Sequence, residues 1–281
     1  MAGSRSGSEY ARQDLERKIL NYSDNKIIYR KVKKGASVLL DALYPRRCPV
    51  CGLIPQNAEE RAGDAFCHIA GRGYLICPSC LTKLSFVTSP VCKKCGKEIL
   101  SETMEYCLDC TRHRRSYEYG VSLLNYNEAA SRSMAAVKYK NKREYLDYYA
   151  EEAVRRCGAR LLRMNADCLV PVPVHPARLR RRGFNQAQVL AEKLGERLEL
   201  PVSTDFLWRG RNTEPQKSLS PVERLKNLEA AFEAAPVPFQ RLLLVDDIYT
   251  TGSTIEACSR VLLRAGAEKV YFFTVCIGQG Q

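Results

Sequence analysis

Apolar and polar positions alternate in a regular succession over the second half of the chain. Segments that indicate strands occupy residues 117–126, 167–174, 201–207, 242–245 and 269–276, and the first of them, YEYGVSLLNY, alternates between polar and apolar residues. Apolar residues at helical spacing predict helices over residues 128–140, 143–163, 185–198 and 255–265. Because strands and helices take turns, the pattern predicts an α/β fold with a largely parallel sheet.

The first 116 residues lack this succession. Residues 46–111 are rich in turn residues and too poor in apolar periodicity to build a core without metal. Residues 1–8 consist mainly of Ser, Gly and Arg and are expected to be disordered, and residues 9–20 favour a short polar helix. We therefore predict an N-terminal extension (1–37), a small metal-dependent domain (38–116) and the α/β domain (117–281).

The strand at 242–245 leads into the most informative segment, LLLVDDIYTTGST. The acids Asp246 and Asp247 are predicted to fall where the strand ends, and a turn of small and hydroxylated residues precedes the helix at 255–265. This turn, here named the hydroxyl turn, comprises Thr250, Thr251, Gly252, Ser253 and Thr254. Amide N–H groups at a helix N-terminus bind phosphate, and small side chains let it approach closely. Adjacent carboxylates can accept hydrogen bonds from ribose hydroxyls or hold Mg²⁺ through water. The segment predicts a sugar-phosphate site.

Two other phosphate-binding motifs also combine a strand, a turn and a helix. Asp-Asp after an apolar strand is typical of P-loop NTPases, but the chain contains no G-x-x-x-x-G-K-[ST]. No G-x-G-x-x-G follows a strand, so the dinucleotide-binding fingerprint is absent as well.

Eight of the 13 cysteines form four C-x-x-C pairs. Two such pairs supply the four thiolates of a closed structural zinc site, so the sequence predicts two Zn²⁺ ions. Spacing alone leaves sequential and cross-braced pairing open. The expected ligands are Cys48, Cys51, Cys77, Cys80, Cys92, Cys95, Cys107 and Cys110. The isolated cysteines at 157, 168, 258 and 276 are expected in the core.

The composition is that of a basic globular protein, with 45% hydrophobic residues and a formal net charge of +13. Basic clusters lie at residues 30–34, 112–115 and 178–182, and such clusters can bind the phosphates of a polyanion. No apolar run reaches the length of a membrane span, and the N-terminus lacks an apolar signal region. We expect a cytoplasmic protein without a membrane span.

The segment 242–254 resembles the phosphoribosyl-pyrophosphate (PRPP) loop of type I phosphoribosyltransferases. The resemblance implies that Asp246 and Asp247 bind the ribose hydroxyls and that the hydroxyl turn binds the 5′-phosphate, with Ile248 and Tyr249 near the reaction centre. It further implies that pyrophosphate binds on the loop after the first core strand. That loop, with a nearby arginine, comprises Pro173, Val174, His175, Pro176 and Arg178.

The order of motifs over residues 38–278 resembles the ComF family of competence-associated proteins. These motifs are the zinc ribbons, VPVPVH, RRGFNQ (181–186), a flexible hood within 208–228 and VDDIYTTGST. The hood residues of the resemblance are Thr213, Gln216, Ser220, Arg224 and Asn227. The resemblance implies PRPP bound with Mg²⁺, two structural zinc ions, and a role in DNA uptake with other competence proteins. The chain has no N-terminal catalytic cysteine or glutaminase domain, so a glutamine-dependent reaction is unsupported.

Two hypotheses from different classes follow. The first is an enzyme, a phosphoribosyltransferase that acts on PRPP and an unidentified acceptor. The second is a non-catalytic protein that responds to PRPP or a nucleotide and handles single-stranded DNA. In a parallel sheet, ligands bind in the crevice outside the carboxyl ends of the strands, which the loops after Val174 and Asp247 are expected to face. The basic segment Arg180, Arg181 and Arg182, expected as a loop, fits both hypotheses because it lies beside this crevice.

Overall fold

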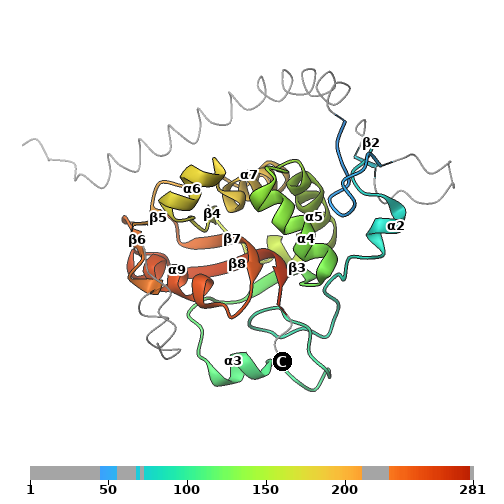
Figure 1. Cartoon of the computed structure of the whole chain (residues 1–281). Coiled ribbons are helices and arrows are strands. Elements are labelled where there is room, and N and C mark those ends of the chain that lie inside the picture. The colour runs from blue at the N-terminus through green and yellow to red at the C-terminus, as the bar shows by residue number, and fades with distance from the viewer. Residues whose placement is uncertain (1–44, 56–67, 70–72, 211–227, 279–281) are drawn as a thin grey trace, which may run out of the picture.

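The computed structural model describes residues 45–55, 68–69, 73–210 and 228–278 (Figure 1). Several expectations fall outside these residues, among them the N-terminal extension, the basic cluster at 30–34 and the named hood residues. Within the described part, two-residue strands β1 (His68–Ile69) and β2 (Gly73–Tyr74) form an antiparallel pair beside the first cysteines.

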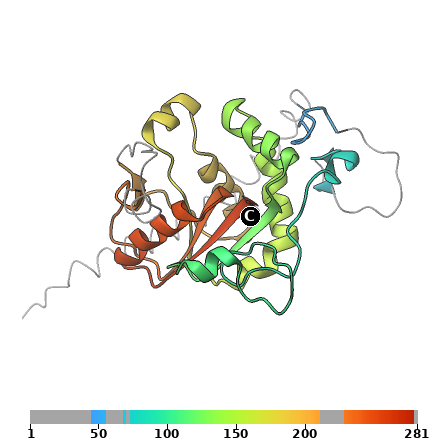
Figure 2. The ribbon, with the colours of Figure 1, turned by 60° about the horizontal axis from the view of Figure 1, so that its bottom comes forward.

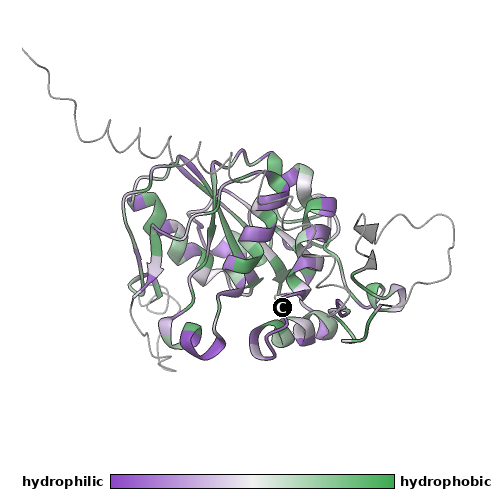
Figure 3. Ribbon diagram, turned by 90° about the horizontal axis from the view of Figure 1, so that it is seen from above, coloured by the Kyte–Doolittle hydropathy of each residue, from purple (hydrophilic) through white to green (hydrophobic). Residues whose placement is uncertain are grey.

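A four-stranded parallel sheet forms the centre of the fold, which confirms the α/β prediction. The strand order is β3 (Gly120–Asn125), β8 (Lys269–Ile277), β7 (Arg241–Tyr249) and β4 (Cys168–Pro171). Residues 242–245 of β7 are fully buried, as expected for a central strand covered on both faces. Figure 3 shows apolar residues concentrated in this sheet, with more hydrophilic residues on the helices around it.

Helices cover both faces of the sheet and give a three-layer architecture (Figure 1). One face carries α4 (Glu128–Tyr139), α5 (Tyr145–Leu162) and α7 (Gln186–Leu198), which pack around Leu243 and Val245. The other face carries α9 (Ser253–Arg264) and the antiparallel pair β5 (Leu207–Arg209) and β6 (Phe232–Ala234), which pack around Leu242 and Leu244. This division follows from the period-two alternation of a strand.

The two groups of C-x-x-C cysteines lie on opposite faces of the sheet. Cys48 and Cys80, the latter in α2 (Pro78–Leu81), belong to the core on the α5 side. Cys92, Cys95 and Cys107, the last at the start of α3 (Leu108–Arg112), belong to the core on the α9 side. Figure 2 shows α2 and α3 on different sides of the α/β domain. Each cysteine group therefore contacts a different part of the fold.

Four details of the predicted elements were wrong. Strand β7 does not stop before the acids but pairs with β8 through Tyr249, because the neighbouring strand is equally long. Strand β3 is buried at every position instead of alternating, since α5 packs on it and residues 85–87 hydrogen-bond along its outer edge. The basic segment 178–182 is not a loop but part of helix α6 (Pro176–Arg182), which begins with proline. Residues 201–207 are mostly not a strand; a single bridge joins Val202 to Leu169, and β5 starts only at Leu207.

The isolated cysteines at 157, 168, 258 and 276 are buried, as predicted. Among the helices that the structure describes, none combines the length and the apolar character that crossing a bilayer requires.

Candidate functional site

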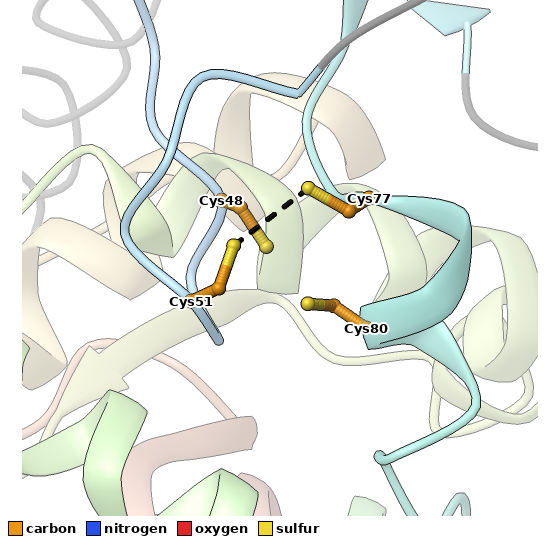
Figure 4. Close-up of side chains that lie close together, drawn as sticks. All are labelled: Cys48, Cys51, Cys77 and Cys80. Atoms are coloured by element: carbon orange, nitrogen blue, oxygen red, sulfur yellow. Dashed lines mark hydrogen bonds between the residues drawn. The ribbon is translucent and has the colours of Figure 1, made fainter. Parts of the chain in front are cut away.

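The eight C-x-x-C cysteines form two tetrads with sequential pairing. Within each tetrad all Sγ atoms lie within 4.8 Å of one another. The first tetrad consists of Cys48, Cys51, Cys77 and Cys80, whose side chains point toward a common centre (Figure 4). The second consists of Cys92, Cys95, Cys107 and Cys110. We name the segments 48–80 and 92–110 the first and second ribbon.

The two ribbons repeat one local design. The knuckle glycines Gly52 and Gly96 have φ angles of 77° and 75°, a conformation that favours glycine. Each glycine N–H donates to the carbonyl of the first cysteine of its knuckle over 2.9 Å. Each second pair begins a short helix, with Cys77 or Cys107 as its N-cap. In each ribbon this arrangement places four sulfur atoms around one point.

The sulfur geometry fits zinc. A tetrahedral site with Zn–S bonds of about 2.3 Å requires sulfurs about 3.8 Å apart. The distance from Cys51 Sγ to Cys77 Sγ is 3.7 Å, and that from Cys95 Sγ to Cys107 Sγ is 3.6 Å. Four thiolates without histidine form a closed ligand set, which is typical of structural zinc and leaves no position for a substrate.

The hydroxyl turn lies between β7 and α9. Gly252 is the N-cap of α9 with a φ of 75°, and a Cβ there would lie 2.2 Å from the hydroxyl oxygen of Tyr249. Thr251 Oγ1 and Ser253 Oγ lie 2.9 Å apart. None of the described residues accepts a hydrogen bond from the amides of residues 251–254. The turn thus carries free N–H donors and hydroxyls at the positive end of a helix dipole.

The two acids of β7 occupy different environments, because successive strand residues face opposite sides of the sheet. Asp247 is 4% exposed; it forms an ion pair with Lys138 of α4 and accepts a 3.0 Å hydrogen bond from Gln186 of α7. Asp246 accepts a 2.8 Å hydrogen bond from the amide of Asp247. Lys138 and Gln186 thus fill one side of the acid pair.

Burial and the neighbouring charge of Asp247 raise the pKa of Asp246 well above its ordinary value. On the α9 side the neighbour of Asp246 is Cys258. Burial, followed by the charge of Asp246, raises the pKa of the Cys258 thiol well above its ordinary value. A carboxyl group in this setting gains from a cation or a hydrogen-bond donor that stabilises its charged form.

Helix α6 follows β4 at the same edge of the sheet as the acids, because β4 and β7 are parallel neighbours. His175 is its N-cap, and its Nδ1 atom accepts a 3.2 Å hydrogen bond from the amide of Ala177. Arg178, Arg180 and Arg181 are exposed. Arg182 instead contacts Gln186, and burial lowers its pKa while Asp247 acts in the opposite direction. The structure therefore divides the predicted basic cluster, with Arg182 turned toward the acids.

The side chain of Tyr249, which was expected near the reaction centre, is buried. The ring is 1% exposed and stacks on Phe272 at 5.0 Å between centroids. Its hydroxyl lies 2.9 Å from that of Tyr117. The ring belongs to the core on the α9 side of the sheet, although strict alternation from Leu243 and Val245 would place it on the α5 side with Asp247.

Three residues near the acids and the hydroxyl turn were missed from the sequence. They are Lys138, Arg115 and Arg209; the first binds Asp247, and the second donates a 2.9 Å hydrogen bond to the carbonyl of Thr251. Arg209 has a buried Nε without a hydrogen-bond partner among the described residues, and burial, then the charge of Arg178, lowers its pKa. The contacts of Lys138 and Arg115 join distant segments, so no local spacing predicts them.

Comparisons with known proteins agree with this division of the chain. Residues 39–111 match the family described as Double zinc ribbon domain, and residues 179–281 match the Phosphoribosyl transferase domain. Fold and site thus define a protein with a double zinc ribbon and a phosphoribosyltransferase domain.

The relatives define the family further. Competence protein F of Haemophilus influenzae is 31% identical over 72% of this chain and 90% of its own length. Competence protein ComFC of Bacillus subtilis is 29% identical over 71% of this chain and 83% of its own length. DNA utilization protein YhgH of Escherichia coli (strain K12) is 28% identical over 72% of this chain and 89% of its own length. The chain belongs to the ComF family.

Proposed function

We propose that this protein binds PRPP with Mg²⁺ and transfers its phosphoribosyl group to an acceptor. The observation that carries the proposal is the row of free amide donors at residues 251–254, directly beside the acids Asp246 and Asp247. The matching phosphoribosyltransferase domain supports it. In this assignment the 5′-phosphate accepts from the hydroxyl turn, and the carboxylates accept from the ribose hydroxyls.

The pyrophosphate end of PRPP would lie against the N-terminus of α6. Residues Pro173, Val174 and His175 lead into this helix, and Arg178 is exposed in its first turn. Magnesium, when bound with PRPP, supplies positive charge that stabilises the departing pyrophosphate. The protein itself contributes positioning and charge, since no dedicated acid or base is required for such a reaction.

A calorimetric titration with PRPP and Mg²⁺ tests this proposal. We expect binding by the wild type and loss of binding in the Asp246→Asn, Asp247→Asn double variant. The matched control is Asp205→Asn, an exposed acid on another loop, which should bind as the wild type does. Absence of binding by the folded, zinc-loaded wild type would contradict the proposal.

The alternative is a protein that handles single-stranded DNA without transferring a phosphoribosyl group. Tyr139 at the end of α4 is 69% exposed, and the guanidinium of Arg182 lies 5.8 Å from its ring centroid. An exposed aromatic ring beside arginines can stack on a base while the cations contact phosphates. The names of the relatives, with competence and DNA utilization, agree with this role.

Binding of an oligothymidylate tests the alternative, that the protein handles single-stranded DNA. If it holds, Tyr139→Ala should weaken DNA binding by about 1–3 kcal/mol, whereas the double acid variant should bind DNA normally. The reverse pattern, with PRPP turnover lost in Asp246→Asn and no DNA binding, would favour the enzyme.

A further inference from the structure

Three consecutive residues a few positions after the second ribbon, Arg115, Ser116 and Tyr117, each contact a different part of the predicted phosphate site. We name them the docking tripeptide. The Nη2 atom of Arg115 donates to Thr251 O over 2.9 Å and to Asp109 Oδ2 over 2.6 Å, and its side chain is only 7% exposed. Arg115 therefore joins helix α3 of the second ribbon to the hydroxyl turn.

Ser116 binds the first turn of α9. Its amide donates to Glu256 Oε2 and its hydroxyl to Glu256 Oε1, both over 2.8 Å. The Glu256 carboxylate is fully buried and also accepts from Arg260 Nε over 2.7 Å. The amide of Glu256 donates to the carbonyl of Gly252 over 2.8 Å. Ser116 thus fixes the helix that supplies the free amides.

Tyr117 binds the other flank of the turn. Its hydroxyl and that of Tyr249 lie 2.9 Å apart, and the Tyr249 hydroxyl leaves no space for a side chain at Gly252. The backbone between Tyr249 and Glu256 is therefore held at three points by consecutive residues of one segment.

The contact of Arg115 also sets the direction of an amide. In a trans peptide the C=O of one residue and the N–H of the next point in opposite directions. Because the Thr251 carbonyl points toward Arg115, the Gly252 N–H points away from it, to the side where the turn has no described acceptor. An amide held in this direction before the ligand arrives saves the entropy of ordering it on binding.

We propose that Arg115 is a positioning residue for the hydroxyl turn and that it couples the second zinc ribbon to sugar-phosphate binding. This inference rests on the proposed function, in which the turn binds the 5′-phosphate. The first ribbon has no such connection in the described chain; Arg46 beside it forms an ion pair with Asp147 of α5, on the opposite face of the sheet. Among the described residues, the second ribbon is thus the one connected to the phosphate site.

The test compares Arg115→Gln with Arg114→Gln, whose wild-type side chain is exposed one residue earlier. Two quantities are measured on the zinc-loaded full chain: amide hydrogen exchange of residues 250–257, and the affinity for PRPP with Mg²⁺. For Arg115→Gln we expect faster exchange of this peptide and binding about tenfold weaker, the effect of losing one charge-assisted hydrogen bond. Arg114→Gln should match the wild type in both.

The exchange measurement needs no ligand, so it separates the two proposals. Wild-type protein that fails to bind PRPP contradicts the proposed function, whereas unchanged exchange and affinity in Arg115→Gln overturn the role of Arg115. If Arg115→Gln does not fold with two zinc ions, Arg115→Lys replaces it. A lysine keeps the charge but replaces the planar Nη2 amino group, which donates to both Asp109 and Thr251, by a tetrahedral ammonium on a flexible stem. Exchange of residues 250–257 as slow in Arg115→Lys as in the wild type would equally contradict the role.

Discussion

The hydroxyl oxygens of Tyr117 and Tyr249 lie 2.9 Å apart in the interior of the protein. Tyr249 is the last residue before the hydroxyl turn, and Tyr117 lies in the connection between α3 and β3. Each hydroxyl is the hydrogen-bond partner of the other. The pair joins the metal-binding segment to the strand that carries both acids, and it explains why the Tyr249 ring is directed away from Asp247.

The pair predicts non-additive stability. Tyr117→Phe and Tyr249→Phe should each lower the free energy of unfolding by about 1–3 kcal/mol, because each leaves one buried hydroxyl unpaired. The double variant should lose less than the sum of the two, since both polar groups are then gone. Denaturant unfolding of the four proteins measures this cycle, and strictly additive losses would show that the hydroxyls do not interact.

Zinc content tests whether the two cysteine tetrads bind metal. We expect about two zinc ions per chain, and strong chelation should unfold residues 46–111 while sparing the parallel sheet. Zinc analysis with circular dichroism before and after chelation measures both. Carefully prepared protein with one zinc ion or none would contradict the assignment of one or both tetrads.

Single-ligand variants separate the two ribbons. Cys110→Ser should speed hydrogen exchange of residues 250–257 and weaken PRPP binding, because Asp109, the anchor of Arg115, lies next to this ligand. Cys51→Ser removes one ligand from the first tetrad and is the matched control. It should leave the exchange of residues 250–257 unchanged. Equal effects of the two variants on the hydroxyl turn would argue against a specific connection.

Asp147 predicts acid lability of the contact between the first ribbon and the helices. Burial alone would raise its pKa, but Lys193 and Arg46 outweigh burial and lower the pKa below its ordinary value of 3.8. A carboxyl group with a lowered pKa stabilises the fold above pH 3.8, and this contribution disappears as the pH falls through the folded-state pKa.

The Asp147→Asn variant should therefore be less stable than the wild type by about 2–3 kcal/mol at neutral pH, with the difference shrinking below about pH 4. Urea unfolding at a series of pH values measures the difference. Glu144→Gln is the control, because the Glu144 side chain forms only a partly exposed pair with Lys142 at 3.5 Å. Its effect should stay below about 1 kcal/mol. A stability gap for Asp147→Asn that does not change with pH would refute the assignment.

Lys138 supplies the positive charge next to Asp247 in the free protein. Lys138→Met should lower stability by about 2–4 kcal/mol, since it leaves a buried carboxylate without its cation. It should also make PRPP binding depend more steeply on Mg²⁺, because the divalent ion then has to replace the positive charge of Lys138. Binding isotherms at several Mg²⁺ concentrations check this, with the surface variant Lys140→Met as control. Identical Mg²⁺ dependence of PRPP binding in both variants would show that Lys138 is not part of the site.

The exposed arginines of α6 predict a salt effect on DNA binding. If single-stranded DNA binds there, replacing Arg180 and Arg181 by Gln should lessen the slope of log affinity against log salt by about 0.7 for each lost phosphate contact. The doubly substituted protein and Arg114→Gln can be compared by anisotropy with an oligothymidylate. An unchanged slope would place DNA binding elsewhere or exclude it.

Local spacing was sufficient for the features that depend on neighbouring residues. The pairs Cys48/Cys51 and Cys92/Cys95, each followed by a glycine, predicted both knuckle turns. The apolar run before Asp246 predicted the central strand. Pairing of the tetrads was left open, because spacing does not say which pairs meet. The end of β7 was misplaced, since acids inside a strand are disfavoured locally and only the pairing with β8 extends it.

Sequence by itself determined the α/β class, the two metal-binding segments and the position of the hydroxyl turn, because each depends on periodicity or on residues close in the chain. Tertiary structure alone decided that Lys138 meets Asp247 across 109 positions and that Arg115 meets Thr251 across 136. It also decided that the two ribbons lie on opposite faces of the sheet. Such contacts depend on how strands are ordered and layered, and that order is set by the burial of both sheet faces together, which no local pattern encodes.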